Sequence, residues 1–223
     1  MSTPGPPLRL QPPEPAAVSA AAPSDTARLA REMIAAGALF HQRGWVPATG
    51  GNFSARMASD RMLITASGWH KGELTEDGFL VADLDGTAED SSRKTSYETQ
   101  LHCQIYQAQP AAACVLHTHS VANTLLSRRL RSVTLRDYEL LKLLPGISTH
   151  DVTVEIPVFD NDQDIPRLAA RVDAHMKQHV VPAYLIAGHG LYAWGSTVAQ
   201  ARHRVEALEF MFECELRSLE NLR

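Results

Sequence analysis

The 223-residue sequence lacks the features that would place a protein in a membrane, outside the cell or on a nucleic acid. No uninterrupted apolar run approaches the roughly 20 residues that span a bilayer. The three cysteines, Cys103, Cys114 and Cys214, are odd in number and show no CxxC spacing, so we expect packed, reduced thiols and no disulfide framework. A formal net charge of -4 gives no general reason to expect a nucleic-acid or membrane-surface partner. We therefore expect a cytoplasmic protein.

Composition divides the chain into a tail and one domain. Residues 1–23 are dominated by Pro, Ala and Ser. Such a segment cannot bury enough apolar area to offset the entropy lost on ordering. We expect residues 1–23 to be disordered and residues 24–223 to form one catalytic domain with a sizeable core.

Apolar periodicity and turn residues predict alternating helices and short strands. Helices are expected at residues 24–44, at 97–109, after Ser120, at 164–178 and from 196 almost to the end. Strands are expected at residues 52–57, 62–66, 79–83, 113–116, 152–159, 183–187 and 191–194. Many short strands between helices predict a central sheet with helices on both sides. The spacing leaves the strand directions open.

Three histidines that follow apolar strands form the strongest functional signal. His117 and His119 come directly after AAACVL, and alternate residues of a strand face the same side, so both imidazoles can converge on one ion. His189 follows a second apolar strand and lies between Gly188 and Gly190, which let the backbone turn sharply. Three imidazoles with an open fourth position are typical of catalytic zinc. Histidines on half-buried strands and in glycine-rich turns also occur without a metal.

Other ionisable residues are weaker candidates. Glu98 lies at the start of the helix that leads to the HTH strand, and Glu139 follows the helix after it. A metal that polarises a carbonyl still needs a positioned base and acid, although isolated glutamates in helical sequence are usually solvated. The remaining seven histidines lack partner spacing and are interpreted as surface or core residues: His41, His70, His102, His150, His175, His179 and His203.

Two glycine-containing loops are candidates for anion binding. Residues 48–54, ATGGNFS, place two glycines beside small hydrogen-bonding side chains, and residues 65–68, TASG, are followed by Lys71. Exposed backbone N–H groups, hydroxyls and a lysine charge suit a phosphate. Neither loop has the P-loop spacing, so nucleotide binding by that route is not expected. Each loop could equally be a tight turn.

Taken together, five segments resemble the class II aldolase/adducin family: GGNFSAR, ITASGWHKG, SYETQLHCQIY, VLHTHS and AGHGLYAWG. They occur in the family's order between about residues 25 and 215. The resemblance implies a three-layer α/β/α fold with a mainly antiparallel central sheet, and a homotetramer with active sites at subunit interfaces. It also implies one Zn²⁺ per subunit, bound by His117, His119 and His189. Ligand type alone leaves iron or manganese open.

The resemblance also implies roles for polar residues. The residues expected to hold a substrate phosphate are Asn52, Ser67, Gly68 and Ser96, with Lys71 close by. Glu98 matches a glutamate that the family's aldolases use as acid/base and that can touch the metal. The segments RDYELLKLLPG and EIPVFDNDQDI resemble the family's dehydratases, in which the glutamate matching Glu139 is the catalytic acid/base. Because Glu98 is also present, the division of roles between the two carboxylates stays open.

These likenesses predict a lyase that acts on a small phosphorylated ketose and removes water from 5-methylthioribulose 1-phosphate, a step of methionine salvage. Zinc would acidify the C3 proton, and Glu139 would move protons. One alternative is a sugar-phosphate aldolase or 4-epimerase acting on fuculose- or ribulose-type phosphates, with Glu98 as the main proton carrier. A second is a non-catalytic interaction module like the adducin head, which would need neither HTH nor GHG.

Overall fold

The structure is a computed structural model that describes residues 25–58 and 60–221. The tail at residues 1–23, for which we predict disorder, lies outside the described residues. The strands are β1 (Asn52–Arg56), β2 (Arg61–Thr65), β3 (Phe79–Asp83), β4 (Cys114–Thr118), β5 (Ser132–Arg136), β6 (Thr153–Phe159), β7 (Ala183–Ile186) and β8 (Gly190–Gly195). They form one sheet in the order β3-β2-β1-β4-β8-β7-β6-β5. Only the β6–β7 pair is parallel among the strand pairs of the described chain, so the predicted mainly antiparallel sheet is confirmed.

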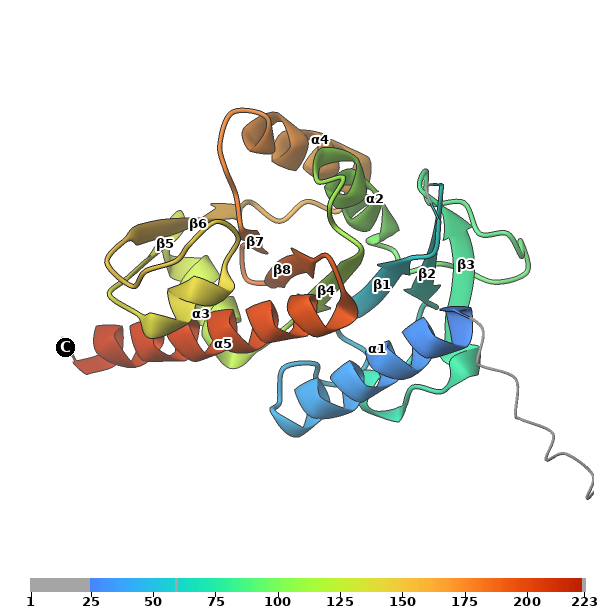
Figure 1. Cartoon of the computed structure of the whole chain (residues 1–223), viewed down its shortest axis with the longest axis horizontal. Helices are drawn as coiled ribbons and strands as arrows, with labels where there is room; N and C mark the ends of the chain where they lie inside the picture. Colours follow the sequence, from blue (N-terminus) through green and yellow to red (C-terminus); the bar gives the residue numbers. More distant parts are fainter. Residues whose placement is uncertain (1–24, 59, 222–223) are drawn as a thin grey trace, which may run out of the picture.

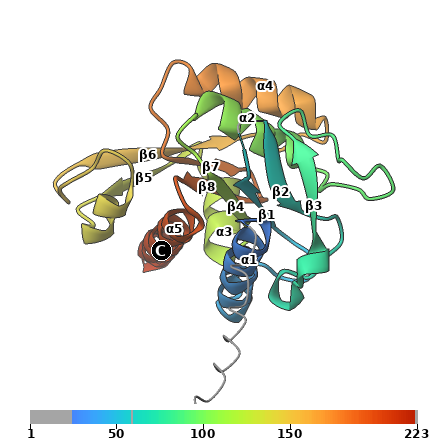
Figure 2. The same ribbon diagram turned by 45° about the vertical axis from the view of Figure 1, so that its right-hand side comes forward.

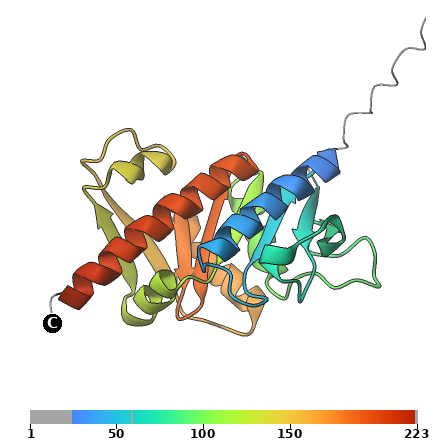
Figure 3. The same cartoon turned by 90° about the horizontal axis from the view of Figure 1, so that it is seen from below.

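Helices cover both faces of this sheet (Figure 1). The α-helices are α1 (Asp25–Gln42), α2 (Thr99–Ala108), α3 (Val121–Arg129), α4 (Ile165–Met176) and α5 (Val198–Asn221). Short 3-10 helices are η1 (Lys71–Glu73), η2 (Glu76–Gly78) and η3 (Glu139–Leu143). Helices α2 and α4 lie on one face and α1, α3 and α5 on the other, which completes the three layers (Figure 2). Figure 3 shows α1 and α5 lying across the same face.

Strand alternation divides the apolar residues into two cores. On β4, Leu116 belongs to the core under α1, α3 and α5, whereas Val115 belongs to the core under α2 and α4. Phe212 of α5 fills the first core and Tyr106 of α2 the second, and both are buried. Each large apolar side chain contributes about 1.5–3 kcal/mol when fully buried. His117, the next residue after Leu116, therefore points to the α2 side of the sheet.

Local signals explain most element boundaries. Ser120 caps α3 as predicted, because its hydroxyl accepts a hydrogen bond from the backbone N–H of Asn123 at 3.0 Å. Gly44 has a φ of 72°, which suits the turn that follows α1. Strand β5 was not predicted, because only Val133 and Leu135 face the core in its five residues and it pairs with β6 alone. No helix in the described ranges is both long and apolar enough to cross a membrane.

Candidate metal centre

Strand register brings a row of side chains together on the α2 face of the sheet. Asn52 on β1 lies opposite His117 on β4, and His117 lies opposite Tyr192 on β8. The His117 imidazole stacks on the Tyr192 ring, with 4.0 Å between centroids and 15° between planes. Because side chains alternate along a strand, His119 follows His117 onto the same face. The strand register thus places the His117 imidazole, which is stacked on Tyr192, beside the Asn52 side chain.

The three histidines singled out in the sequence meet at this place. The Nε2 atoms of His117 and His119 are 2.7 Å apart, and those of His117 and His189 are 3.4 Å apart. His189 reaches the site from the tight turn between β7 and β8, where Gly188 has a φ of 62° and the His189 N–H donates to the Ile186 carbonyl. Three imidazoles from two distant segments therefore converge.

Close backbone packing at Gly190 explains why the turn carries a glycine on its other side. A Cβ atom at Gly190 would lie 2.2 Å from the Thr118 carbonyl oxygen and 2.8 Å from Cε1 of His117. Real Cβ atoms essentially never come so close to a carbonyl oxygen. The glycine lets β8 pass directly beside His117 of β4 and beside His119, which follows that strand.

Glu98 joins the histidines as a fourth possible ligand. Its Oε1 atom lies 2.8 Å from Nε2 of His189, and its Oε2 atom lies 3.4 Å from Nε2 of His117. One ligand atom from each of the four residues lies within 4.8 Å of all the others. Nitrogen ligands at tetrahedral zinc are spaced by about 3.3 Å, given Zn–N bonds of about 2.0–2.1 Å. The cluster has the donor types and nearly the spacing for a small divalent metal.

The tautomer of His117 fits a metal ligand. Its Nδ1–H donates to the Leu191 carbonyl oxygen at 2.8 Å, so Nε2 carries the lone pair that faces the cluster. Metal-binding histidines usually have such a hydrogen bond on the ring nitrogen away from the metal, which fixes the ring orientation. The residues present therefore fit a bound metal.

Burial and charge set the ionisation of the cluster. Burial lowers the pKa of His117 well below its usual range and lowers the pKa of His119 to about 4, so both imidazoles are neutral at pH 7. Burial alone would raise the pKa of Glu98, but the neighbouring His117 and His189 and a hydrogen bond from Asn52 outweigh it and hold that pKa well below its usual range. Neutral imidazoles beside an anionic carboxylate are the protonation states that metal binding requires.

A cavity of about 310 Å³ opens beside the cluster and contains every residue for which we predicted phosphate binding. Its lining includes Asn52, Ser67, Gly68, Lys71 and Ser96, together with Glu98, His119 and His189. The Lys71 ammonium is buried and donates to the carbonyl oxygens of Thr49 at 2.8 Å and Trp69 at 2.7 Å. Burial lowers the pKa of Lys71 to about 8, which still leaves a largely charged group at neutral pH.

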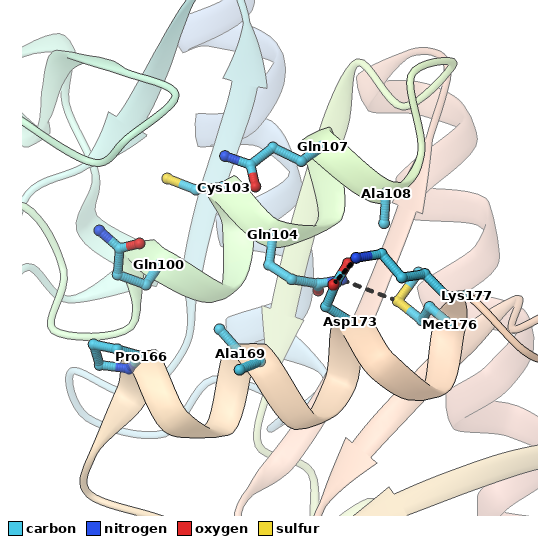
Figure 4. A pocket seen from close by; sticks show the side chains of 11 residues that line it. Gln100, Cys103, Gln104, Gln107, Ala108, Pro166, Ala169, Asp173, Met176 and Lys177 are labelled. Carbon is cyan, nitrogen blue, oxygen red and sulfur yellow. Dashed lines mark hydrogen bonds and ion pairs between the residues drawn. The ribbon is translucent and has the colours of Figure 1, made fainter.

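A larger cavity of about 640 Å³ lies between α2 and α4, away from these residues (Figure 4). It is lined by helix side chains such as Gln104, Ala169 and Lys177. Gln104 donates to the sulfur of Met176, and Lys177 pairs with Asp173. None of the residues predicted for the site lines it, so the smaller cavity is the candidate substrate site.

Comparison with known proteins agrees with this architecture. The family model for the class II aldolase and adducin N-terminal domain matches residues 31–216. This chain belongs to the class II aldolase/adducin family.

Two relatives from this family cover most of the chain. A methylthioribulose-1-phosphate dehydratase of Pseudomonas aeruginosa (strain UCBPP-PA14) is 50% identical over 195 residues, which cover 86% of this chain and 95% of the relative. A protein of the same name from Methylococcus capsulatus (strain ATCC 33009 / NCIMB 11132 / Bath) is 53% identical over 190 residues, covering 84% and 93%. The crystal structure of L-fuculose-1-phosphate aldolase from Thermus thermophilus superposes with a TM-score of 0.72 and 26% identity, over 89% of this chain and 99% of that one.

Glu139 lies apart from the cluster of histidines and Glu98 in its own chain. It begins η3, its side chain is 71% exposed, and its carboxylate pairs with the Lys142 ammonium at 2.6 Å. The hydrogen bond and charge of Lys142 lower the pKa of Glu139. Glu139 does not line the cavity beside the histidines. Its catalytic role stays a prediction.

Two residues that support the site were missed. The sequence assigns His102 to the surface or the core because it lacks partner spacing; it is a core residue, and its fully buried ring also bonds to Asn52 and Ser54. The sequence did contain a signal, because Glu98 and His102 are four residues apart and therefore share a helix face. Glu209 of α5 was not considered, and nothing in the sequence around it marks it among the charged residues of that helix.

Glu209 holds the end of β4, where His117 and His119 lie on either side of Thr118. It is buried and accepts hydrogen bonds from Thr118 at 2.6 Å, Ser120 at 2.5 Å and Asn123 at 2.9 Å. Thr118 lies between His117 and His119 and points to the opposite face of the sheet, where α5 packs.

Proposed function

We propose that this protein is a metal-dependent lyase that removes water from 5-methylthioribulose 1-phosphate and forms 5-methylthio-2,3-dioxopentyl phosphate. The observation that carries the proposal is 50% identity to a relative named methylthioribulose-1-phosphate dehydratase, along 95% of that relative. A buried cluster of three histidines and Glu98 beside a polar cavity supports it, because a ketose phosphate needs both a carbonyl-polarising centre and an anion site.

His117, His119 and His189 are the residues that would hold the metal, which we propose to be one Zn²⁺ per subunit. When bound, the metal supplies Lewis acidity, which polarises the substrate carbonyl and acidifies the neighbouring C–H bond. The bond to Leu191 and the stacking on Tyr192 fix the His117 ring in advance, so little reorganisation is needed.

Asn52, Ser67, Gly68, Lys71 and Ser96 are the residues that we propose for binding the phosphate. They share one cavity with Glu98 and two of the histidines, so a phosphate there lies within a short ketose's length of the cluster. Lys71 donates two of its three N–H groups to backbone carbonyl oxygens, which leaves the third to bind an anion. Such binding would hold C3 of the substrate against the base.

We propose that Glu98 and Glu139 divide the proton transfers. Glu98 is held as a carboxylate inside the cluster, where it can act as a metal ligand or a base. Glu139 is exposed on its own chain and could reach a cluster only from a second copy, as in a homotetramer with active sites between subunits. It would take the C3 proton and return a proton to the departing C4 hydroxyl, so that water leaves and the enol formed becomes the diketone. We place this step in methionine salvage in the cytoplasm.

A sugar-phosphate aldolase is the second candidate, because Glu98 lies 2.8 Å from His189 and the L-fuculose-1-phosphate aldolase fold matches closely. The two candidates differ in the bond that breaks. Purified protein is incubated with 5-methylthioribulose 1-phosphate and, separately, with fuculose 1-phosphate. Dicarbonyl absorbance and loss of water from the first substrate alone support dehydration. Cleavage of fuculose 1-phosphate to two fragments, with the first substrate left unchanged, would overturn the proposal.

Paired variants test the carboxylates. Glu139→Gln is expected to abolish dehydration while metal content stays equal to that of the wild type. Glu213→Gln is the matched control, since it neutralises another exposed glutamate that pairs with a basic residue. Full activity of Glu139→Gln would reject its assigned role.

A further inference from the structure

We propose that His102 is a positioning residue that, through Asn52, holds the Glu98 carboxylate against the three histidines. The effect on turnover rests on the proposed function, whereas the effect on metal binding does not. Helix α2, the Glu98 residue that precedes it and strand β1 supply every member of the connection, and none of them except Glu98 is a proposed metal ligand.

Four consecutive hydrogen bonds lead from the core to the cluster. The Tyr106 hydroxyl bonds to Ser54 Oγ at 2.8 Å, and Ser54 Oγ bonds to Nδ1 of His102 at 2.7 Å. Nε2 of His102 bonds to Oδ1 of Asn52, and the Asn52 amide nitrogen donates to Oε2 of Glu98 at 2.7 Å. Ser54, His102 and Asn52 each form one hydrogen bond towards Tyr106 and one towards Glu98.

This chain of hydrogen bonds has one direction. A carbonyl oxygen can only accept, so His102 must donate its Nε2–H to Asn52. In the neutral ring Nδ1 must then accept a hydrogen bond from the Ser54 hydroxyl, and Ser54 accepts one from the Tyr106 hydroxyl. Burial lowers the pKa of His102 to about 4, which keeps the ring neutral at pH 7. The direction ends at the Asn52 amide, whose NH₂ group faces Glu98.

The direction matters because an amide can point either way. If the Asn52 side chain were flipped, its oxygen would face the Glu98 carboxylate and the two would repel. His102 opposes the flip, since the ring would have to change tautomer and the hydrogen bonds of Ser54 and Tyr106 would have to reverse at the same time. Glu98 therefore keeps a donor on the side away from His189.

Water cannot replace these bonds. Ser54 and His102 are fully buried, and Asn52 is 3% exposed and Tyr106 2% exposed. An unmade hydrogen bond at such a site costs about 1–3 kcal/mol. Spacing aligns the members, because His102 and Tyr106 share a face of α2, Glu98 is the residue directly before that helix, and positions 52 and 54 share a face of β1.

The test compares variants that lose hydrogen bonds of this series with variants of similar size that keep these bonds or never had them. His102→Phe removes both bonds, whereas His102→Gln can still donate to Asn52 and accept from Ser54. Tyr106→Phe removes the far end of the chain. Tyr184→Phe is the matched control, because Tyr184 is a fully buried tyrosine of the same core whose hydroxyl has no hydrogen-bond partner among the described residues.

Two readouts are measured on each full-length variant. The Zn²⁺ dissociation constant is obtained by competition with a chromogenic chelator, and kcat and KM are obtained with 5-methylthioribulose 1-phosphate. We expect His102→Phe to weaken Zn²⁺ binding about tenfold or more, as loss of such supporting partners usually does, and to lower kcat more than it changes KM. We expect His102→Gln to recover most of both, Tyr106→Phe to fall between, and Tyr184→Phe to match the wild type.

Three results would overturn the inference. His102→Phe could match the wild type in both readouts, His102→Gln could fall as far as His102→Phe, or Tyr184→Phe could fall as far as Tyr106→Phe. If His102→Phe does not fold, the comparison of Tyr106→Phe with Tyr184→Phe decides. If the wild type does not consume the substrate, the proposed function fails, and the Zn²⁺ series still decides the role of His102.

Discussion

Replacing Glu209 by Gln is expected to make the protein more stable at alkaline pH. This carboxyl group is buried behind the HTH strand, and burial raises its pKa from 4.5 to about 7, against three hydrogen bonds that favour the charged form. Because the folded pKa lies above the unfolded one, the stability contributed by the neutral acid is fully present below pH 4.5 and is lost as pH rises through 7. The difference corresponds to about 3 kcal/mol.

The measurement is urea unfolding of metal-free wild type and Glu209→Gln between pH 4.5 and 8. Gln is neutral at every pH and can still bond to the same hydroxyl and amide groups, so the variant keeps the low-pH stability of this site. The buried His117 and His119 give an opposite slope, because their folded pKa values are lowered, but they do so equally in both proteins. We expect the free energy of unfolding of the variant to rise by about 3 kcal/mol relative to that of the wild type between pH 4.5 and 8.

The reasoning would be refuted if the difference in the free energy of unfolding between variant and wild type stayed constant from pH 4.5 to 8. It would also be refuted if the wild type became the more stable of the two as pH rises. Glu206→Gln provides the control, because Glu206 lies on the same helix and its side chain is one-third exposed beside Arg202. We expect its effect on the free energy of unfolding to be about 1 kcal/mol or less, as for other partly exposed ion pairs.

Three further predictions concern the site and its support. Glu98→Gln removes the negative charge from the cluster and should weaken Zn²⁺ binding about tenfold in chelator competition; unchanged affinity would exclude Glu98 from the metal's surroundings. Gly190→Ala must push β8 away from the Thr118 carbonyl, so urea unfolding should show a loss of about 2 kcal/mol or more together with weaker Zn²⁺ binding, and a neutral result would show that the strands separate easily. Phe212→Ala empties a fully buried position and should cost about 3–5 kcal/mol in urea unfolding; a loss under about 1 kcal/mol would contradict the packing described.

The sequence predicts those parts of the site that depend on local geometry. Alternation along a strand places His117 and His119 on one face, and a glycine-flanked turn presents His189, so the three rings could be proposed before any coordinates. The pairing of Asn52 with His117 depends on register between strands 65 residues apart in the chain, which no local pattern encodes. Resemblance to the class II aldolase family led us to expect Asn52 in the substrate site, but it did not predict this pairing. No local pattern sets Glu139 apart from other exposed glutamates, because it pairs with Lys142 one helical turn away and does not line the cavity.

The distance along the chain between the histidines also affects how the protein matures. His117 and His189 are separated by 72 residues, and β8 must pair with β4 before their rings can meet. A nascent chain released only as far as β7 lacks the His189 imidazole, and it also lacks Leu191 and Tyr192 of β8, which hold the His117 ring in place. If the cluster binds a metal as proposed, tight uptake would wait until synthesis has passed the β7–β8 turn, and a metal-loaded molecule would be one whose central strands have already paired.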